Sequence, residues 1–143
     1  MTSNPAIVPE LVVTDITKSL VFYVEILGFS IKYQREEEGF AYLILGEAHL
    51  MLDQIDKGRT WKTGEFEIPL GRGINFQIEV PDIESLLGKL KEKEIKLFME
   101  VEEKWYRRED HEVGNKQFIV QDPDGYLLRF FQDLGKRPLT QLV

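Results

Sequence analysis

The feature of this sequence that most constrains its fold is an internal repetition. The pattern Val-x-Asp-Ile occurs at residues 13–16 and again at residues 80–83, and each time it joins an apolar strand-like run to an amphipathic helix. Three further runs rich in aromatic and β-branched residues follow each helix. The chain is therefore predicted to consist of two βαβββ units, and a fold that suits one unit must suit both.

Local signals support this division. Apolar residues recur at helical spacing over residues 16–27, where Asp15 can cap the start of the helix and Gly28 can end it. Asp82 can cap the second helix in the same way. The strand-like runs are residues 29–37, 40–46 and 48–54 in the first unit and residues 74–80, 96–107, 116–122 and 126–133 in the second. Each set of three runs after a helix is predicted to form an antiparallel meander.

We expect one α+β domain over residues 1–143. Repeat one spans about residues 6–54, a connecting loop residues 55–73, repeat two about residues 74–133, and a C-terminal tail residues 134–143. The middle segment contains glycines, a proline and mixed charges. It is interpreted as a loop within one domain, because a four-stranded half could not bury both of its faces alone.

Composition excludes several classes of partner. The 143 residues are 43% hydrophobic, which is enough for a real core, and the absence of cysteine excludes disulfides and thiolate metal sites. A net charge of −7 argues against binding to a nucleic-acid backbone. The sequence shows no apolar run long enough to cross a bilayer and no secretory signal pattern at its N-terminus. We therefore expect a cytoplasmic protein without a nucleic-acid or membrane partner.

Two sequence motifs, together with the repeat, indicate a family. They are VEILGF at residues 24–29 and DPDGYLLRFFQ at residues 122–132. With the Val-x-Asp start of each helix, they resemble the vicinal-oxygen-chelate superfamily, which includes glyoxalase I, extradiol ring-cleaving dioxygenases and bleomycin-resistance proteins. The resemblance covers residues 6–133. It implies a glyoxalase-like fold, in which curved, partly open mixed sheets form a concave cup that holds the ligand.

The resemblance also identifies four positions at which the enzymes of the superfamily hold a divalent metal ion. The matching residues here are Val8, Met51, Asn75 and Arg129. A hydrocarbon, a thioether, an amide and a guanidinium cannot form such a site. We therefore expect no metal, no other cofactor and no catalytic residue. The enzyme alternative is a metal-dependent lyase or dioxygenase that uses a shifted register, with ligands drawn from Glu10, His49, Asp53 and Glu79.

Arg129 raises a separate question, because it is a permanent cation between Leu128 and Phe130 in an apolar run. If that strand is covered on both faces, the guanidinium needs a partner. The two-residue period of a strand places Glu10, His49 and Gln77 in the same cup as Arg129, and Glu10 is the expected ion-pair partner. His111, in the charged segment 108–114, is expected to be a solvated histidine in a surface loop.

Within the superfamily, the chain resembles the metal-free bleomycin-resistance proteins most closely. That resemblance implies a homodimer that traps a cationic aromatic antibiotic in a groove between its subunits and leaves it chemically unchanged. Such a ligand needs aromatic faces to stack on and carboxylates near its amines. The predicted ligand-binding residues are Phe40, Tyr42, Trp61, Trp105, Tyr106, Glu10, His49 and Arg129. Ordinary core packing is the alternative for the aromatic residues, and an ion pair that only fills the floor of the cup is the alternative for Arg129 and Glu10. Another organic ligand or a purely interaction-based role is the alternative for the function.

Overall fold

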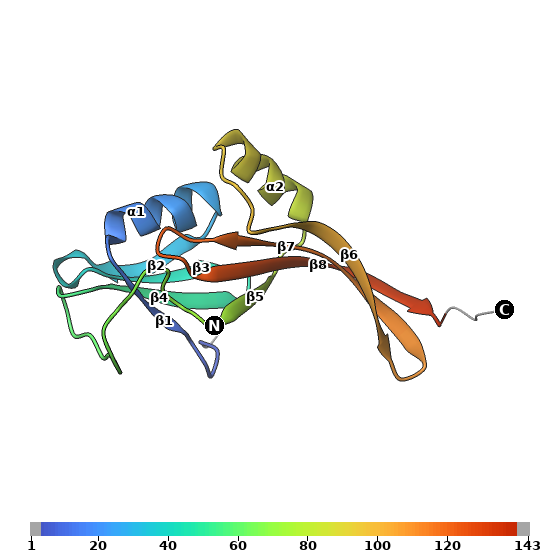
Figure 1. The fold of residues 1–143 in the computed structure, drawn as a ribbon, viewed down its shortest axis with the longest axis horizontal. Helices are drawn as coiled ribbons and strands as arrows, with labels where there is room; N and C mark the ends of the chain where they lie inside the picture. Colours follow the sequence, from blue (N-terminus) through green and yellow to red (C-terminus); the bar gives the residue numbers. More distant parts are fainter. Residues whose placement is uncertain (1–3, 140–143) are drawn as a thin grey trace. The chain divides into compact units, whose positions relative to one another are not determined.

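The structure is a computed structural model that describes residues 4–139. It contains two four-stranded sheets in two compact units (Figure 1). The first unit runs to Arg72 and also takes in Asp122–Tyr126, and the second comprises Gly73–Gln121 and the chain from Leu127 onward. The predicted α+β class is confirmed.

The order of elements repeats between the units. The first contains β1 (Glu10–Val13), α1 (Ile16–Leu20), the π-helical turn η1 (Val21–Ile26), β2 (Ser30–Arg35), the 3-10 turn η2 (Glu36–Glu38), β3 (Phe40–Leu45) and β4 (Ala48–Gln54). The second contains β5 (Asn75–Glu79), α2 (Ile83–Glu92), β6 (Met99–Arg108), β7 (His111–Gln121) and β8 (Leu127–Pro138). The sheets have the orders β1-β4-β3-β2 and β5-β8-β7-β6, in which β1–β4 and β5–β8 are the parallel pairs. The predicted βαβββ duplication is therefore confirmed.

The repeat extends to single hydrogen bonds. Gln54 Oε1 accepts a hydrogen bond from the backbone N–H of Ile16 at 2.9 Å, and Gln132 Oε1 accepts one from that of Ile83 at 3.0 Å. In both units a glutamine of the last strand thus holds the first turn of the helix. Asp15 and Asp82 also cap their helices as predicted, by accepting from the backbone N–H groups two and three residues ahead.

The first helix is less regular than predicted. It is α-helical only to Leu20 and continues as a π-helical turn, in which the N–H of Leu27 donates to the carbonyl of Phe22, five residues back. Gly28 then takes a φ of 91°, a left-handed conformation that glycine tolerates, and the helix ends there as predicted. A helical apolar spacing does not distinguish an α-helix from a π-helical turn, which explains the difference.

The last two strands are longer than their apolar runs. β7 begins at His111, which pairs with Arg108 and Pro138, so the prediction that His111 lies in a surface loop was wrong. β8 continues to Pro138, through the first half of the expected C-terminal tail, and residues 140–143 of that tail lie outside the described residues. Figure 1 shows β6, β7 and β8 continuing side by side beyond the part that α2 covers. Cross-strand pairing stabilises this polar stretch, as in the 3.0 Å ion pair between Arg137 and Glu112.

The Asp-Pro-Asp-Gly turn at residues 122–125 is held by its first carboxylate. Asp122 is 5% exposed, and it accepts backbone hydrogen bonds of 2.9 Å from residues 124, 125 and 126. The hydroxyl of Tyr23 donates a fourth, at 2.7 Å. Burial raises the pKa of Asp122, and these hydrogen bonds act against that rise by stabilising the carboxylate. The motif that identifies the family is thus a structural anchor.

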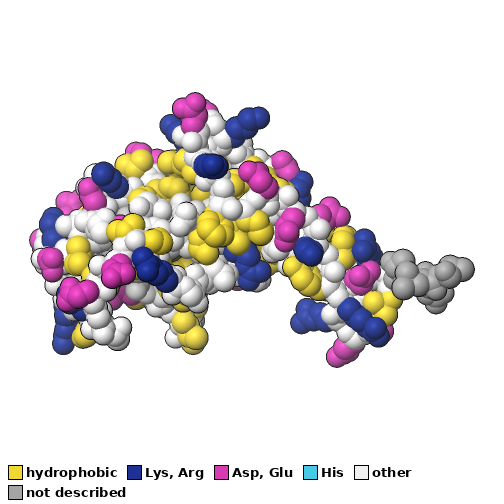
Figure 2. All heavy atoms as spheres, viewed as in Figure 1, with side chains coloured by type: hydrophobic (Ala, Val, Ile, Leu, Met, Phe, Trp, Pro, Cys, Tyr) yellow, Lys and Arg dark blue, Asp and Glu magenta, His cyan; other side chains and the backbone are white. Residues whose placement is uncertain are grey.

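On the face shown in Figure 2, acidic and basic side chains are interspersed and form no continuous basic area. Among residues 4–139, none of the helices combines the length and apolar character that a membrane span requires.

Candidate functional site

One face of the first sheet carries several of the residues predicted to bind a ligand. In the register of the sheet, Glu10 is paired with Met51, Met51 with Tyr42, and Asp53 with Phe40. Residues that are directly opposite each other on neighbouring strands point to the same side. These five side chains therefore share one face, and the apolar residues that alternate with them point to the other.

A pocket of about 270 Å³ opens on this face. Its volume is close to the lower end of the range of about 300–1,000 Å³ that is typical of small-ligand sites. Strands β1, β3 and β4, the end of β2 and the loop after β4 provide the walls. The lining residues are Glu10, Arg35, Glu38, Phe40, Asp53, Gly58, Arg59 and Trp61. Three of the predicted residues, Glu10, Phe40 and Trp61, thus lie together.

Two carboxylates in this pocket are partly removed from water. Burial raises the pKa of Glu10, and the negative charge of Asp53 raises it further. Burial likewise raises the pKa of Asp53, which is 5% exposed, and the charge of Glu38 adds to the rise. The positive charge of Arg35 lowers both pKa values. The pocket therefore contains negative charge that is incompletely compensated, and an entering cation would stabilise it.

Arginine side chains cover the aromatic rings of the pocket. The guanidinium carbon of Arg35 lies 4.2 Å from the centroid of Phe40. The Nε atom of the same side chain forms an ion pair with Glu38. That of Arg59 lies 4.9 Å from the centroid of Trp61, a side chain that is 69% exposed. These cation–π contacts show that both rings present a face to a positive group. An organic cation could occupy the same positions if the arginines moved aside.

The other predicted residues of the first unit are packed beside the pocket. The hydroxyl of Tyr42 lies 2.7 Å from Nδ1 of His49, and the ring of Tyr42 stacks on Tyr33 at 5.3 Å between centroids. Tyr42 is 2% exposed, so the core-packing alternative describes it better than direct ligand contact. Tyr33 is 44% exposed on the same face, and the prediction did not include it. The signal was available, because Tyr33 and Arg35 alternate along β2 as residues of one face do.

The remaining predicted aromatic residues belong to the second unit. Trp105 and Tyr106 are adjacent on β6, so their side chains point to opposite faces of the sheet. The guanidinium carbon of Arg137 lies 4.0 Å from the centroid of Trp105, and the Nε1–H of Trp105 donates to Glu103 at 3.0 Å. Both faces of β6 therefore carry one aromatic residue each, and a role for either in ligand binding stays a prediction.

Arg129 finds its hydrogen-bond partners on the neighbouring strand. Its Nε–H donates to Asn75 Oδ1 at 3.2 Å, and its Nη2 donates to Gln77 Oε1 at 2.7 Å. The residues before and after it in β8 are fully buried, whereas Arg129 itself is half-buried. The strand is thus not closed on both faces, and the guanidinium is held by neutral amides. The pairing of Arg129 with Glu10, which belongs to the other unit, stays a prediction.

The structure gives no support to the shifted-register metal site. Among residues 4–139, no group of three or more His, Cys, Asp or Glu side chains could hold a metal ion. The alternative set of Glu10, His49, Asp53 and Glu79 is therefore not assembled as a ligand set. At the four positions indicated by the resemblance, the amide oxygen of Asn75 already accepts a hydrogen bond from Arg129. The residues present do not suit a divalent ion, because a guanidinium repels it.

The two βαβββ units and their sheet orders define a protein with the glyoxalase-like fold. The chain belongs to the glyoxalase/bleomycin resistance protein/dioxygenase superfamily, whose sequence model matches residues 6–130. A bleomycin resistance protein from Geobacillus stearothermophilus is similar to it, with 31% identity over 137 residues, 89% of this chain and 96% of the relative. The family resemblance found in the sequence is confirmed.

Two solved structures are also similar. A glyoxalase/bleomycin resistance protein/dioxygenase superfamily member from Vibrio splendidus 12B01 is 41% identical, with 89% of this chain and 97% of that one covered and a TM-score of 0.42. A virulence protein from Salmonella typhimurium is 20% identical, with 92% and 98% covered and a TM-score of 0.67. The second likeness supports the glyoxalase-like fold.

Proposed function

We propose that this protein binds a small organic cation with a flat aromatic part, of the bleomycin type, and releases it chemically unchanged. The observation that carries the proposal is the pocket of the first unit, in which the buried carboxylate of Asp53 and the exposed, only partly desolvated carboxylate of Glu10 lie beside the rings of Phe40 and Trp61. The likeness to a bleomycin resistance protein over 89% of the chain supports the same ligand class.

The pocket offers the two interactions that such a ligand requires. A hydrogen bond between an amine of the ligand and a carboxylate contributes about 1.5–3 kcal/mol, because one partner is ionised. Stacking on an aromatic ring adds about 0.5–1.5 kcal/mol beyond the buried area. Arg59 must leave the face of Trp61 before a ligand can stack there, and the exposure of Trp61 makes this exchange sterically simple.

We further propose that the protein is a cytoplasmic homodimer and that the second copy extends the pocket into a groove. The sheet orders place β1 and β2 at the edges of the first sheet and β5 and β6 at the edges of the second. Unpaired edges and half-covered sheets favour a symmetric partner. Light scattering on the purified protein should give twice the mass of one chain, and a monomer at micromolar concentration would remove this part of the proposal.

Calorimetric titration with copper-free and copper-loaded bleomycin tests the ligand. We expect saturable binding at micromolar concentration or below, with at least one of the two forms. Asp53→Asn should weaken it about tenfold or more, since a charge-assisted hydrogen bond is lost. Trp61→Ala should weaken it about threefold to tenfold through the loss of stacking.

A matched control lies in the same loop as Trp61. Phe66 also carries a cation over its ring, with Lys62 Nζ at 5.6 Å from the centroid, but it does not line the pocket. Phe66→Ala should therefore leave bleomycin binding unchanged. If neither form of bleomycin binds, or if Phe66→Ala weakens binding as much as Trp61→Ala, the pocket is not the antibiotic site.

A further inference from the structure

The second unit contains a separate pocket that the proposed function does not use. It has a volume of about 310 Å³ and lies between α2, the loop that follows α2 and the start of β6. The lining residues are Leu87, Leu90, Lys91, Ile95, Lys96, Leu97, Glu100 and Val101. Five of these are aliphatic, so the pocket can hold an apolar body. Its volume limits that body to a short chain or a single ring.

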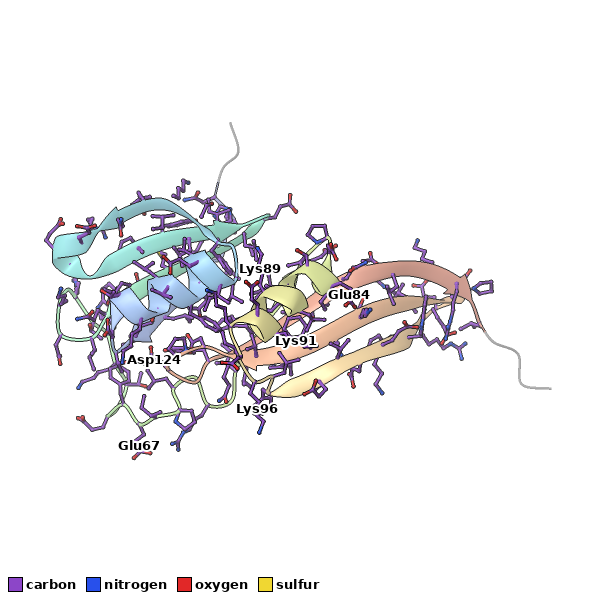
Figure 3. All side chains as sticks on the ribbon, turned by 90° about the horizontal axis from the view of Figure 1, so that it is seen from above. Glu67, Glu84, Lys89, Lys91, Lys96 and Asp124 are labelled. Carbon is purple, nitrogen blue, oxygen red and sulfur yellow. The ribbon has the colours of Figure 1, made fainter. Side chains whose placement is uncertain are left out.

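The net charge of the residues that line this pocket is positive, opposite in sign to that of the whole protein. Lys91 lies in the last turn of α2 and Lys96 in the loop beyond it (Figure 3). Both side chains are exposed, and within residues 4–139 neither amine takes part in a recorded ion pair. Glu100 is the one acidic residue of the lining, so positive charge is in excess there, on a chain whose net charge is −7.

Stabilisation of the C-terminus of α2 explains Lys91 but not Lys96. A cation in the last turn of a helix stabilises the partial negative charge of the helix C-terminus, and Lys91 and Lys89 meet that requirement on α2. Lys96 lies after the helix, next to the aliphatic residues Ile95 and Leu97 that line the same pocket. Two unpaired amines above an aliphatic floor complement an anion that carries an apolar body.

We propose that this pocket is a second binding site, which takes a small carboxylate with an apolar chain or ring. The apolar part lies on the aliphatic residues of α2, the loop and β6, and the carboxylate is bound by Lys91 and Lys96. The site belongs to the second unit and shares no residue with the pocket of the first unit. It therefore stands independently of antibiotic binding.

Titration with decanoate below its micelle concentration tests this site, with calorimetry for affinity and amide chemical shifts for location. We expect saturable binding, with shifts concentrated at the C-terminal end of α2 and the start of β6. The double variant Lys91→Gln/Lys96→Gln should bind decanoate about tenfold more weakly, because charge-assisted contacts are lost. Its affinity for decanol, which has the same chain without the charge, should be unchanged.

A matched control is available at the C-terminal end of α2. Lys89→Gln/Lys93→Gln removes two charges from residues that do not line the pocket, so decanoate affinity should stay within about twofold of the original. This comparison separates direct contact from the general effect of net charge. Leu97→Asn should weaken decanoate and decanol alike, because it alters the apolar floor that both would use.

Four results would each overturn the proposal. They are the absence of decanoate binding at millimolar concentration, equal binding of decyltrimethylammonium, equal losses in the two double-lysine variants, and shifts confined to other parts of the chain. Two further outcomes would assign the pocket differently. Binding to phosphatidylglycerol vesicles without binding to monomeric decanoate would indicate a membrane contact. Shifts of the same amides on dilution of the ligand-free protein would indicate that a second copy covers the pocket.

Discussion

The two units share one topology but differ in the chemistry of corresponding positions. The register pairs Glu10 with Met51 in the first sheet, and Gln77 with Arg129 in the second. In the first sheet, the residue on the parallel edge strand is an acid whose pKa is raised by burial. In the second, the same place holds a neutral amide that accepts a hydrogen bond from a cation.

This difference shows which properties the duplication constrains. The caps at Asp15 and Asp82 and the glutamines that bind the helix starts are the same in both units, because they stabilise the βαβββ unit itself. The paired residues Glu10 and Gln77 on the other face of each sheet can differ, because neither belongs to the buried core. One unit therefore presents incompletely compensated negative charge, and the other presents a guanidinium satisfied by amides.

The turns before the last strands offer the largest contrast in stability. Asp122 in the second repeat accepts four hydrogen bonds, whereas Glu47, in the turn between β3 and β4, is exposed. We expect Asp122→Ala to lower the free energy of unfolding by about 3–5 kcal/mol, because it leaves buried donors without acceptors. Glu47→Ala should change it by less than about 0.5 kcal/mol. Urea unfolding measures both changes in the free energy of unfolding. Similar decreases in the two variants would show that the two turns contribute equally to stability.

Exchanging the paired residues tests the comparison directly. Glu10→Gln gives the first unit the residue of the second, and it should weaken bleomycin binding about tenfold, because a carboxylate is lost. The converse change, Gln77→Glu, places an acid beside Arg129 and should add about 0.5–1 kcal/mol of stability without improving binding. Calorimetry and urea unfolding measure the two effects. Equal bleomycin affinity of Glu10→Gln and the original protein would contradict the assignment of the pocket.

The acids of the first unit also predict a pH dependence. Their folded-state pKa values lie above the ordinary 4.5 of Glu10 and 3.8 of Asp53, so the folded protein holds these protons more tightly than the unfolded chain does. The two groups therefore favour folding below their ordinary pKa values and lose that contribution as the pH rises through the raised ones. Binding of a cation follows the opposite course and strengthens over the same interval.

Titrations with bleomycin from pH 4 to pH 7 measure this effect. We expect affinity to rise with pH until both carboxylates are ionised, and Asp53→Asn should flatten the rise. Asp110→Asn is the control, because the pKa of that exposed acid is lowered by its bond to His111 and it lies in the second unit. If the affinity of Asp53→Asn rose with pH as steeply as that of the original protein, the pH dependence would not come from this carboxylate of the pocket.

The sequence was sufficient for those parts of the structure that depend on local interactions. Helix caps, the glycine at residue 28 and the two-residue period of the strands act over a few residues, so the pattern alone predicts them. The polar ends of β7 and β8 were missed, because their pairing partners are distant in sequence. The apolar run around Arg129 was misread for a related reason: composition does not show which face of a strand is covered.

The candidate pocket was only partly predictable. Glu10, Phe40 and Trp61 were chosen for their chemistry, and the fold brings them together. Arg35, Glu38 and Arg59 were not chosen, although the alternation of Tyr33 and Arg35 along β2 places Arg35 on the face of the pocket. The role of Arg59 depends on where the loop after β4 lies against the sheet. That placement is a tertiary property with no periodic signal in the sequence. Trp105 and Tyr106 are neighbours in the sequence, yet they point to opposite faces of β6 and cannot both line one pocket on that strand.

The smallest expected effect concerns the position that differs most from the metal enzymes. Arg129→Glu supplies a carboxylate at one of their four ligand positions, yet we expect no zinc binding, because Val8 and Met51 remain poor ligands and Asn75 supplies only a neutral amide. Metal analysis after dialysis against zinc would measure it, with Arg129→Gln as the neutral control. Stoichiometric zinc in a folded Arg129→Glu variant, absent from Arg129→Gln, would mean that the other positions are closer to a metal site than their chemistry indicates. In that case one substitution would be enough to turn this chain into a metal-binding protein. The difference between the two units at the paired positions would then be a difference in charge alone.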